Sequence, residues 1–145
     1  MTDIPDQEQK DRVFESKPEP EKLRILIVED HALLRRLFYE AFHDQHTVYT
    51  ASSAEVGWQR HLAHAPNIVF MDIRLPGMNG HTLAQMIKER DPAVYMVMTT
   101  SSDDKADVET ARKNHVDGFI VKPFNKAAIH EHIDHCRAAN PIHKL

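Results

Sequence analysis

The sequence predicts an α/β fold: a doubly wound, five-stranded parallel sheet with helices on both faces. Apolar runs without alternation, such as Ile68–Met71 and Val94–Met98, are typical of strands buried on both faces. Stretches with apolar residues at helical spacing separate these runs, so that strands and helices alternate along the chain. Right-handed crossovers between parallel strands would place the helices on both faces of a single sheet.

The first predicted strand is Leu23–Val28, which ends in the acidic pair Glu29-Asp30. A helix is expected directly after it, because the apolar residues there recur at helical spacing. These residues are Leu33, Leu34, Leu37, Phe38, Ala41 and Phe42. Asp30 stands just before this helix, and we expect its side chain to cap the first turn.

A short strand at about Thr47–Thr50 and a second helix come next. Ser52 and Glu55 have the spacing of a capping box, which predicts that the helix begins at this point. Pro66 is expected to end it, because proline removes a backbone donor and does not continue a helix.

The central strand is Ile68–Asp72, in which four apolar residues lead into a single aspartate. The Gly/Pro turn at Pro76–Gly80 separates it from a third helix, which Leu83–Ile87 marks and Asp91-Pro92 ends. A carboxylate at this point lies at the carboxyl edge of the sheet, where open α/β folds bind their ligands.

Val94–Met98 and Gly118–Val121 are the last two predicted strands. The helix between them, at about 104–114, has a weak apolar face and is expected to pack less firmly than the others. Asn125 is expected to cap a final helix. The apolar residues of these two helices are Ala106, Val108 and Ala111 in the first, and Ala128, Ile129, Ile133 and Cys136 in the second.

The length and composition of the chain fit one globular domain: it has 145 residues, of which 41% are hydrophobic and 28% charged. Residues 1–22, with seven acids, four bases and few large apolar side chains, are expected to form a flexible polar extension. The domain is expected to span residues 23–139, and residues 140–145 to form a C-terminal tail.

Charge and cysteine content exclude several classes of protein. The net charge of −4 is concentrated in residues 1–22, and the nearly neutral remainder lacks the basic footprint of a nucleic-acid binder. No apolar run approaches the length of a membrane span, and the start of the chain lacks a signal sequence. The single cysteine, Cys136, fits a reducing compartment, so we expect a cytoplasmic protein.

Polar residues end four of the predicted strands and should therefore meet at one edge of the sheet: Glu29, Asp30, Asp72, Thr100 and Lys122. Three carboxylates this close repel one another unless a cation compensates for their charge. Oxygen ligands of this kind suit Mg²⁺, which prefers one or two carboxylates together with phosphate oxygens. A lysine and a hydroxyl opposite the metal would complete a site for a phosphoryl group, and a carboxylate can act as the nucleophile.

In order, spacing and strand context, these residues resemble the receiver domain of two-component response regulators, over residues 23 to about 139. The resemblance implies a flavodoxin-like (βα)5 fold with strand order 2-1-3-4-5. It implies that Asp72 is the phosphoacceptor and that Lys122 pairs with a phosphoryl oxygen. It also implies that Asp30, Asp72 and the main-chain carbonyl of Arg74 hold Mg²⁺, with Mn²⁺ as an alternative, while Glu29 reaches the metal through water. The bond from Lys122 to Pro123 is expected to be cis.

The resemblance also implies a conformational switch. Thr99 and Thr100 are both candidates for its hydroxyl, and we choose Thr100 because it lies 28 residues after Asp72 and 22 before Lys122. Phe119, three residues before Lys122, matches the rotating aromatic of the family, although an aromatic here is also compatible with simple packing. Phosphorylation would then remodel the face formed by the fourth helix, the fifth strand and the fifth helix.

The partners that follow from the resemblance are a sensor histidine kinase or a histidine phosphotransfer protein as phosphoryl donor, and a downstream target protein. A homodimer through the remodelled face is a further expectation. No direct contact with nucleic acid and no membrane insertion are expected, and the chain carries no output domain in this reading. Its catalysis would be limited to its own phosphorylation and dephosphorylation, so it is not expected to be an enzyme in the ordinary sense.

Two other functions fit the sequence less well. A Mg²⁺-dependent phosphatase of the haloacid-dehalogenase type also uses a strand-end aspartate, but its general acid stands two residues later, where this chain has Arg74. An inert scaffold that has lost phosphorylation is disfavoured because the complete set of site residues is present. The side chain of Arg74 is expected to be solvated, the alternative being a gate over the phosphorylated aspartate.

Overall fold

The computed structural model describes residues 22–101 and 104–139, so the predictions for residues 1–21 and 140–145 lie outside the described residues. Five parallel strands form one sheet in the order β2-β1-β3-β4-β5, which confirms the predicted fold class. The strands are β1 (Arg24–Val28), β2 (Thr47–Ala51), β3 (Ile68–Asp72), β4 (Tyr95–Thr100) and β5 (Gly118–Val121). The helices are α2 (Ala32–Phe42), α3 (Ala54–His64), α4 (Gly80–Arg90), α5 (Lys105–Lys113) and α6 (Lys126–Ala139).

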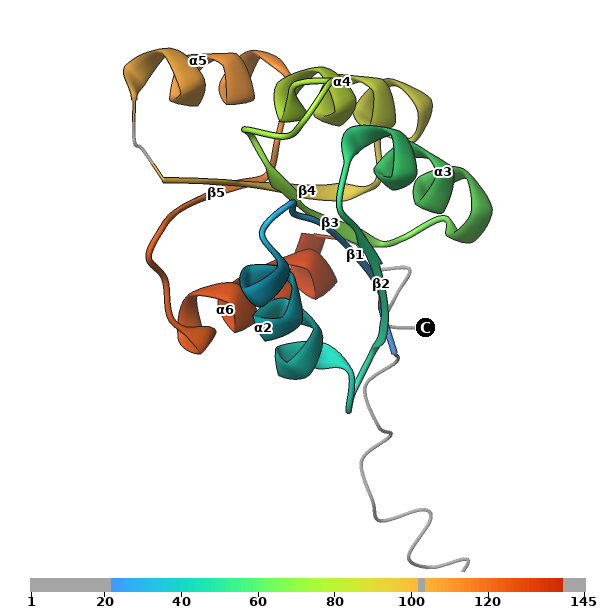
Figure 1. Cartoon of the computed structure of the whole chain (residues 1–145). Helices are drawn as coiled ribbons and strands as arrows, with labels where there is room; N and C mark the ends of the chain where they lie inside the picture. Colours follow the sequence, from blue (N-terminus) through green and yellow to red (C-terminus); the bar gives the residue numbers. More distant parts are fainter. Residues whose placement is uncertain (1–21, 102–103, 140–145) are drawn as a thin grey trace, which may run out of the picture.

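Helices cover both faces of the sheet: α3, α4 and α5 lie on one side and α2 and α6 on the other (Figure 1). Each side has its own apolar core, since neighbouring residues of a strand point to opposite faces. Val69 and Met71 of β3 contribute to the core with α3, α4 and α5. Ile68 and Phe70 contribute to the other, where Phe70 packs against the rings of two phenylalanines of α2.

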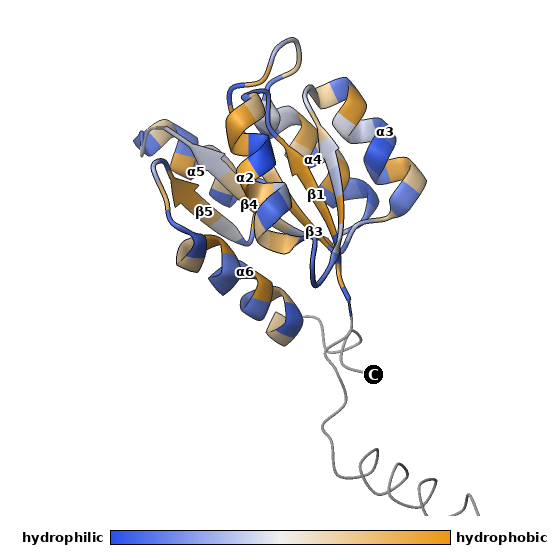
Figure 2. Ribbon diagram, turned by 60° about the horizontal axis from the view of Figure 1, so that its bottom comes forward, coloured by the Kyte–Doolittle hydropathy of each residue, from blue (hydrophilic) through white to orange (hydrophobic). Residues whose placement is uncertain are grey.

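The central strand shows why the apolar runs in the sequence do not alternate. Every residue of β3 is buried, including Asp72, because β1 and β4 flank it and helices cover both of its faces. In Figure 2, β1 and β3 are mostly hydrophobic in colour, whereas the surrounding helices carry many hydrophilic residues. A strand of this kind needs apolar side chains on both faces, and it leaves its single carboxylate at the exit from the core.

Two of the three predicted helix caps need correction. α2 begins after His31, which makes no side-chain capping bond, so the prediction for Asp30 was wrong. α3 is capped by Ser53, whose hydroxyl accepts a hydrogen bond from the N–H of Val56, and not by Ser52. The cap at Asn125 is confirmed, since its Oδ1 accepts a hydrogen bond from the N–H of Ala128 at 2.9 Å.

The turn after β3 depends on Gly80, which begins α4. A Cβ atom at this position would overlap the main-chain carbonyl of Asp72. The N–H of Gly80 donates to the carbonyl of Ile73 at 2.9 Å, so that the start of α4 lies directly against the end of β3. This close approach fixes the course of the chain just beyond Asp72.

Candidate functional site

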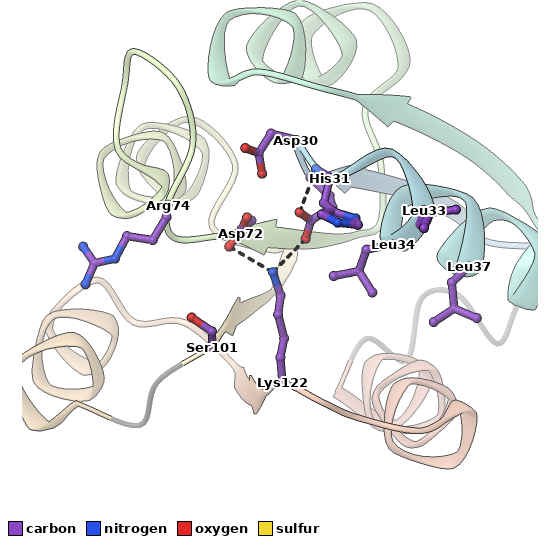
Figure 3. Close-up of a pocket in the computed structure, with 10 residues that line it drawn as sticks. Asp30, His31, Leu33, Leu34, Leu37, Asp72, Arg74, Ser101 and Lys122 are labelled. Carbon is purple, nitrogen blue, oxygen red and sulfur yellow. Dashed lines mark hydrogen bonds and ion pairs between the residues drawn. The ribbon is translucent and has the colours of Figure 1, made fainter.

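A cavity of about 610 Å³ opens at the carboxyl edge of the sheet, where β1, β3, β4 and β5 end (Figure 3). Its lining residues are Glu29, Asp30, His31, Leu33, Leu34, Leu37, Asp72, Arg74, Ser101 and Lys122. One wall is therefore acidic, with Lys122 opposite, and the other is formed by leucines of α2. The parallel sheet brings together residues that lie up to 93 positions apart in the chain.

Three carboxylates meet in this cavity. One carboxylate oxygen from each of Glu29, Asp30 and Asp72 lies within 4.8 Å of the other two. Asp30 is exposed, whereas Glu29 and Asp72 retain only 1% and 5% of their accessible surface. Two of the three negative charges are therefore removed from bulk water, which makes a compensating cation important.

Lys122 supplies one such cation. Its Nζ atom lies 3.1 Å from Oε1 of Glu29 and 3.5 Å from Oδ1 of Asp72. Figure 3 shows its side chain extending from the end of β5 toward Asp72. The peptide bond between Lys122 and Pro123 is cis. One ammonium group thus bridges the two buried carboxylates from the far side of the cavity.

The environment of the cavity raises the pKa of Asp72, the acid at the end of β3. Burial, together with the neighbouring Glu29 carboxylate, raises the pKa of Asp72 to about 7, from an ordinary value of 3.8. Lys122 and the main-chain N–H of Arg74 act in the opposite direction. The raised pKa means that the single lysine does not offset the combined effect of burial and the neighbouring Glu29 carboxylate.

The loop after β1, which carries Glu29 and Asp30, is fixed by hydrogen bonds that the sequence did not indicate. Nη1 of Arg35, one turn into α2, donates to the main-chain carbonyls of Glu29 at 2.9 Å and Asp30 at 3.3 Å. Oε2 of Glu29 accepts a hydrogen bond from the N–H of His31 at 3.1 Å. The acidic loop is therefore held against the start of α2.

The predicted switch residues lie outside the lining of the cavity. Thr100 is buried at the end of β4, while Ser101, the next residue, lines the cavity. By strand alternation Thr100 is on the same face of the sheet as Met98, which pairs in register with Phe119 of β5. Met98 and Phe119 both pack on the side of α3, α4 and α5. Thr100 and Phe119 are thus near neighbours on one face.

Arg74 has a side-chain contact that the sequence did not predict. Its guanidinium points away from Asp72 in Figure 3, and Nη2 lies 3.1 Å from Oδ2 of Asp107 in α5. The side chain is 64% exposed, so the expectation of a solvated arginine is correct in part, but one end is paired. Asp107 is buried and also contacts Nε2 of His81 at 3.2 Å.

The residues of the cavity fit a hard divalent cation. Three carboxylate oxygens within reach of one another, two of them from buried side chains, form an oxygen-only donor set of the kind that Mg²⁺ or Mn²⁺ prefers. The raised pKa of Asp72 shows that its burial and the neighbouring Glu29 disfavour a second negative charge there in the absence of a cation. Other open positions around the cation would be left to water or to phosphate oxygens.

A buried strand-end aspartate beside two further acids and a lysine, on a 2-1-3-4-5 sheet, defines a flavodoxin-like α/β domain with an acidic pocket at the carboxyl edge of its sheet. The family of response regulator receiver domains matches residues 25–134, and the chain belongs to this family. Domains of this family act in two-component signalling and bind Mg²⁺ at an acidic pocket. They interact with histidine kinases or phosphotransfer proteins and with downstream targets.

Relatives of known role include chemotaxis proteins and transcriptional regulators. The chain is 30% identical to the chemotaxis protein CheY of Bacillus subtilis over 77% of this chain and 94% of that protein. It is also 30% identical to CheY of Halobacterium salinarum, over 73% and 89%. It is 27% identical to the probable transcriptional regulatory protein NarL of Mycobacterium tuberculosis, over 88% of this chain but only 60% of that protein's length.

Solved structures support the same fold. A CheY-like receiver domain protein from Methanospirillum hungatei superposes with a TM-score of 0.78 at 23% identity, covering 81% of this chain and 96% of that one. The beryllofluoride-activated receiver domain of DrrB gives a TM-score of 0.75 at 22% identity, covering 81% and 98%. Within residues 22–101 and 104–139, no helix is both long and apolar enough to cross a membrane.

Proposed function

We propose that this chain accepts a phosphoryl group on Asp72 from a phosphohistidine and thereby changes its binding surface. The observation that supports this most directly is the position of Asp72, at the end of β3 within 3.5 Å of the Lys122 ammonium and beside two further carboxylates. Asp72 is the member of the acidic group that belongs to the central strand, and it opens onto the solvent-connected cavity.

In the proposed reaction a carboxylate oxygen of Asp72 attacks the phosphorus atom of the donor. The new P–O bond forms as the P–N bond to the donor imidazole breaks, and the imidazole leaves with a proton from solvent. Lys122, already 3.5 Å from Asp72, would pair with a phosphoryl oxygen. Hydrolysis of the acyl phosphate by water would return the carboxylate, so the chain turns over its own modification and no other substrate.

Asp30, Asp72 and the main-chain carbonyl of Arg74 would hold Mg²⁺ or Mn²⁺, with Glu29 at the second layer through water. When bound, the cation neutralises the negative charge that accumulates as the phosphoryl group approaches the carboxylates. Arg35 would contribute indirectly, because its hydrogen bonds to the carbonyls of Glu29 and Asp30 hold the acidic loop in place.

The leucines beside the cavity favour a macromolecular donor. Leu33 and Leu37 of α2 are 75% and 38% exposed and line the same cavity as Asp72. An exposed apolar surface next to a reacting group is typical of a docking site for another protein. We therefore propose that a sensor kinase or a histidine phosphotransfer protein docks on α2 while its phosphohistidine reaches Asp72.

The output would come from the face formed by α5, β5 and α6. Phosphorylation would draw the Thr100 hydroxyl toward the phosphoryl group and let Phe119, which lies on the same face of the sheet, change its rotamer. Val121, 41% exposed on β5, is an apolar contact already available on that face for a target or a second copy of the chain. A cytoplasmic location and a domain spanning residues 23–139 belong to the same proposal.

The test is an intact mass after incubation with Mg²⁺ and acetyl phosphate, with the Asp72→Asn variant in parallel. One added phosphoryl group on the parent and none on the variant is the expected result. Sedimentation with and without beryllofluoride, a stable mimic of the phosphoryl group, would test the homodimer. No adduct with acetyl phosphate and no binding of beryllofluoride in excess Mg²⁺ would refute the proposed function.

A further inference from the structure

The ion pair between Arg74 and Asp107 joins the loop after β3 to the first turn of α5. Asp107 is the third residue of α5, its side chain is 11% exposed, and its two oxygens have different partners. Oδ2 lies 3.1 Å from Nη2 of Arg74, and Oδ1 lies 3.2 Å from Nε2 of His81 at the start of α4. Arg74 is thus a charged partner of Asp107 that also belongs to the phosphoacceptor cavity.

The attachment of α5 to the rest of the domain depends strongly on this aspartate. In residues 105–113, all of them described, the buried side chains are Asp107 and Ala111. The neighbouring helix α4 buries five residues, among them Leu83 and Ile87. A helix with so small an apolar face gains little from hydrophobic burial, so a polar contact in its first turn has a large share in its position.

Phosphorylation of Asp72 would favour movement of the Arg74 side chain away from Asp107 and toward the phosphoryl group. A divalent cation and Lys122 together bring three positive charges, which balance the carboxylates of Glu29, Asp30 and Asp72. The phosphorylated aspartate carries about two negative charges instead of one, leaving the site one charge short. Arg74 lines the same cavity, and its guanidinium is suited to bind phosphoryl oxygens in a bidentate manner.

Withdrawal of Arg74 would leave Asp107 in an unfavourable state. Its carboxylate would remain buried with His81 as its neighbour from α4, and a buried charge that loses the guanidinium paired with it is destabilised. A helix held by few apolar contacts can relieve this cost by moving so that water reaches the carboxylate.

We propose that Arg74 and Asp107 form a charge-dependent latch: it holds the first turn of α5 in the unphosphorylated protein and opens when Arg74 turns to the phosphoryl group. This inference rests on the proposed phosphorylation of Asp72. Asp107 is a positioning residue, since it acts through Arg74 and does not touch the phosphoryl group. The latch connects the loop after β3 directly to α5, by a route that does not involve the proposed movement of Thr100.

The test compares beryllofluoride affinity in four proteins: the parent, Asp107→Asn, Arg74→Gln and the double variant. Asparagine keeps the shape of the side chain and an acceptor for His81 but removes the charge. Asp107→Asn should bind beryllofluoride about two- to five-fold more tightly, the range expected for a partly exposed ion pair. In the Arg74→Gln background the same substitution should have no effect. Glu109→Gln, which removes an exposed charge from the same helix, is the matched control.

Hydrogen exchange supplies a second readout, because a general loss of stability would speed exchange in every element and the latch predicts a change confined to α5. Beryllofluoride should accelerate exchange of the hydrogen-bonded amides of α5 in the parent, and Asp107→Asn should show this faster exchange without it. An equal effect of Asp107→Asn with Gln at position 74 would overturn the latch, since it would reflect the helix dipole and not the ion pair. Unchanged affinity and exchange would also overturn it. Failure of the parent to bind beryllofluoride would instead refute the phosphorylation on which the latch depends.

Discussion

The Asp72→Asn variant should make the metal-free protein more stable at pH 8, although it removes the central residue of the site. Burial and Glu29 raise the pKa of Asp72 from 3.8 to about 7, and its side chain is only 6% exposed. One pKa unit corresponds to about 1.4 kcal/mol, so ionisation of Asp72 opposes folding by up to roughly 4 kcal/mol. Because Asp72 and Glu29 share this cost, we expect the neutral amide to recover about 2–4 kcal/mol at pH 8.

The sign of the pH dependence follows from proton binding. Between pH 4 and 7 the folded state keeps a proton on Asp72 that the unfolded chain releases. Stability contributed by this proton is therefore present at low pH and is lost as the pH rises through about 7. The advantage of Asp72→Asn should accordingly be largest at pH 8 and small near pH 5.

Urea unfolding in the presence of a chelator, followed by the fluorescence of the single tryptophan, Trp58, measures this directly. The expected gain moves the urea midpoint at pH 8 upward by roughly 1–2 M for a domain of this size. Asp134→Asn, which removes an exposed carboxylate of α6, should leave the midpoint nearly unchanged. Saturating Mg²⁺ should stabilise the parent more than Asp72→Asn, because a ligand of the folded state adds to its stability. An Asn variant less stable than the parent at pH 8, or equally favoured at pH 5 and 8, would refute the reasoning.

Three further changes, two at the site and one at the opposite edge of the sheet, are tested by the same unfolding assay. Lys122→Gln removes the ammonium between Glu29 and Asp72 and should lower the free energy of unfolding of the metal-free protein at pH 8 by about 2–4 kcal/mol. The loss should be smaller at pH 5, and a loss independent of pH would contradict this prediction. Gly80→Ala places a Cβ against the carbonyl of Asp72 and should cost on the order of 3 kcal/mol, whereas a neutral result would contradict the close packing there. His46 is buried, and burial, followed by the charge of Arg137, lowers its pKa from 6.5 to about 4. Stability from neutral His46 should therefore be lost as the pH falls through this range, and His46→Gln should flatten that slope.

The fold could be predicted from the sequence because parallel strands buried on both faces leave an unmistakable signal. β3 is apolar at four consecutive positions and ends in a carboxylate, and no helix or half-exposed strand needs that pattern. The first residue of a helix was less predictable, because a shift of one residue in the backbone changes which side chain can cap the free N–H groups. Ser52 and Glu55 have the spacing of a capping box, yet the helix begins at Ala54, so that the hydroxyl of Ser53 reaches the free N–H of Val56.

The carboxylate group and Lys122 could be predicted for a topological reason: the ends of parallel strands must lie at one edge, whatever the details of packing. The contacts of Arg35 and Arg74 could not. Each depends on where a long side chain ends, and Asp107 lies 33 residues after Arg74 in a helix whose sequence gives no sign of its partner. From the sequence alone Asp107 resembles an ordinary first-turn acid of a helix with few apolar residues, and its burial is seen only in the structure.

The two cationic side chains at the cavity, Lys122 and Arg74, are expected to have different roles: one in the stability of the unmodified protein, the other in its response to phosphorylation. Lys122 is 20% exposed and lies between Glu29 and Asp72, so its charge is already committed to the unmodified site. The side chain of Arg74 is 64% exposed and its guanidinium is paired with Asp107 outside the cavity, so it is available when a further negative charge appears. Removing the lysine should therefore change the folding of the unmodified protein most, whereas removing the arginine should change mainly how α5 responds to charge at Asp72. If both cationic side chains were paired with carboxylates inside the cavity, the protein would be more stable, but neither could move to the phosphoryl group and so alter the position of α5.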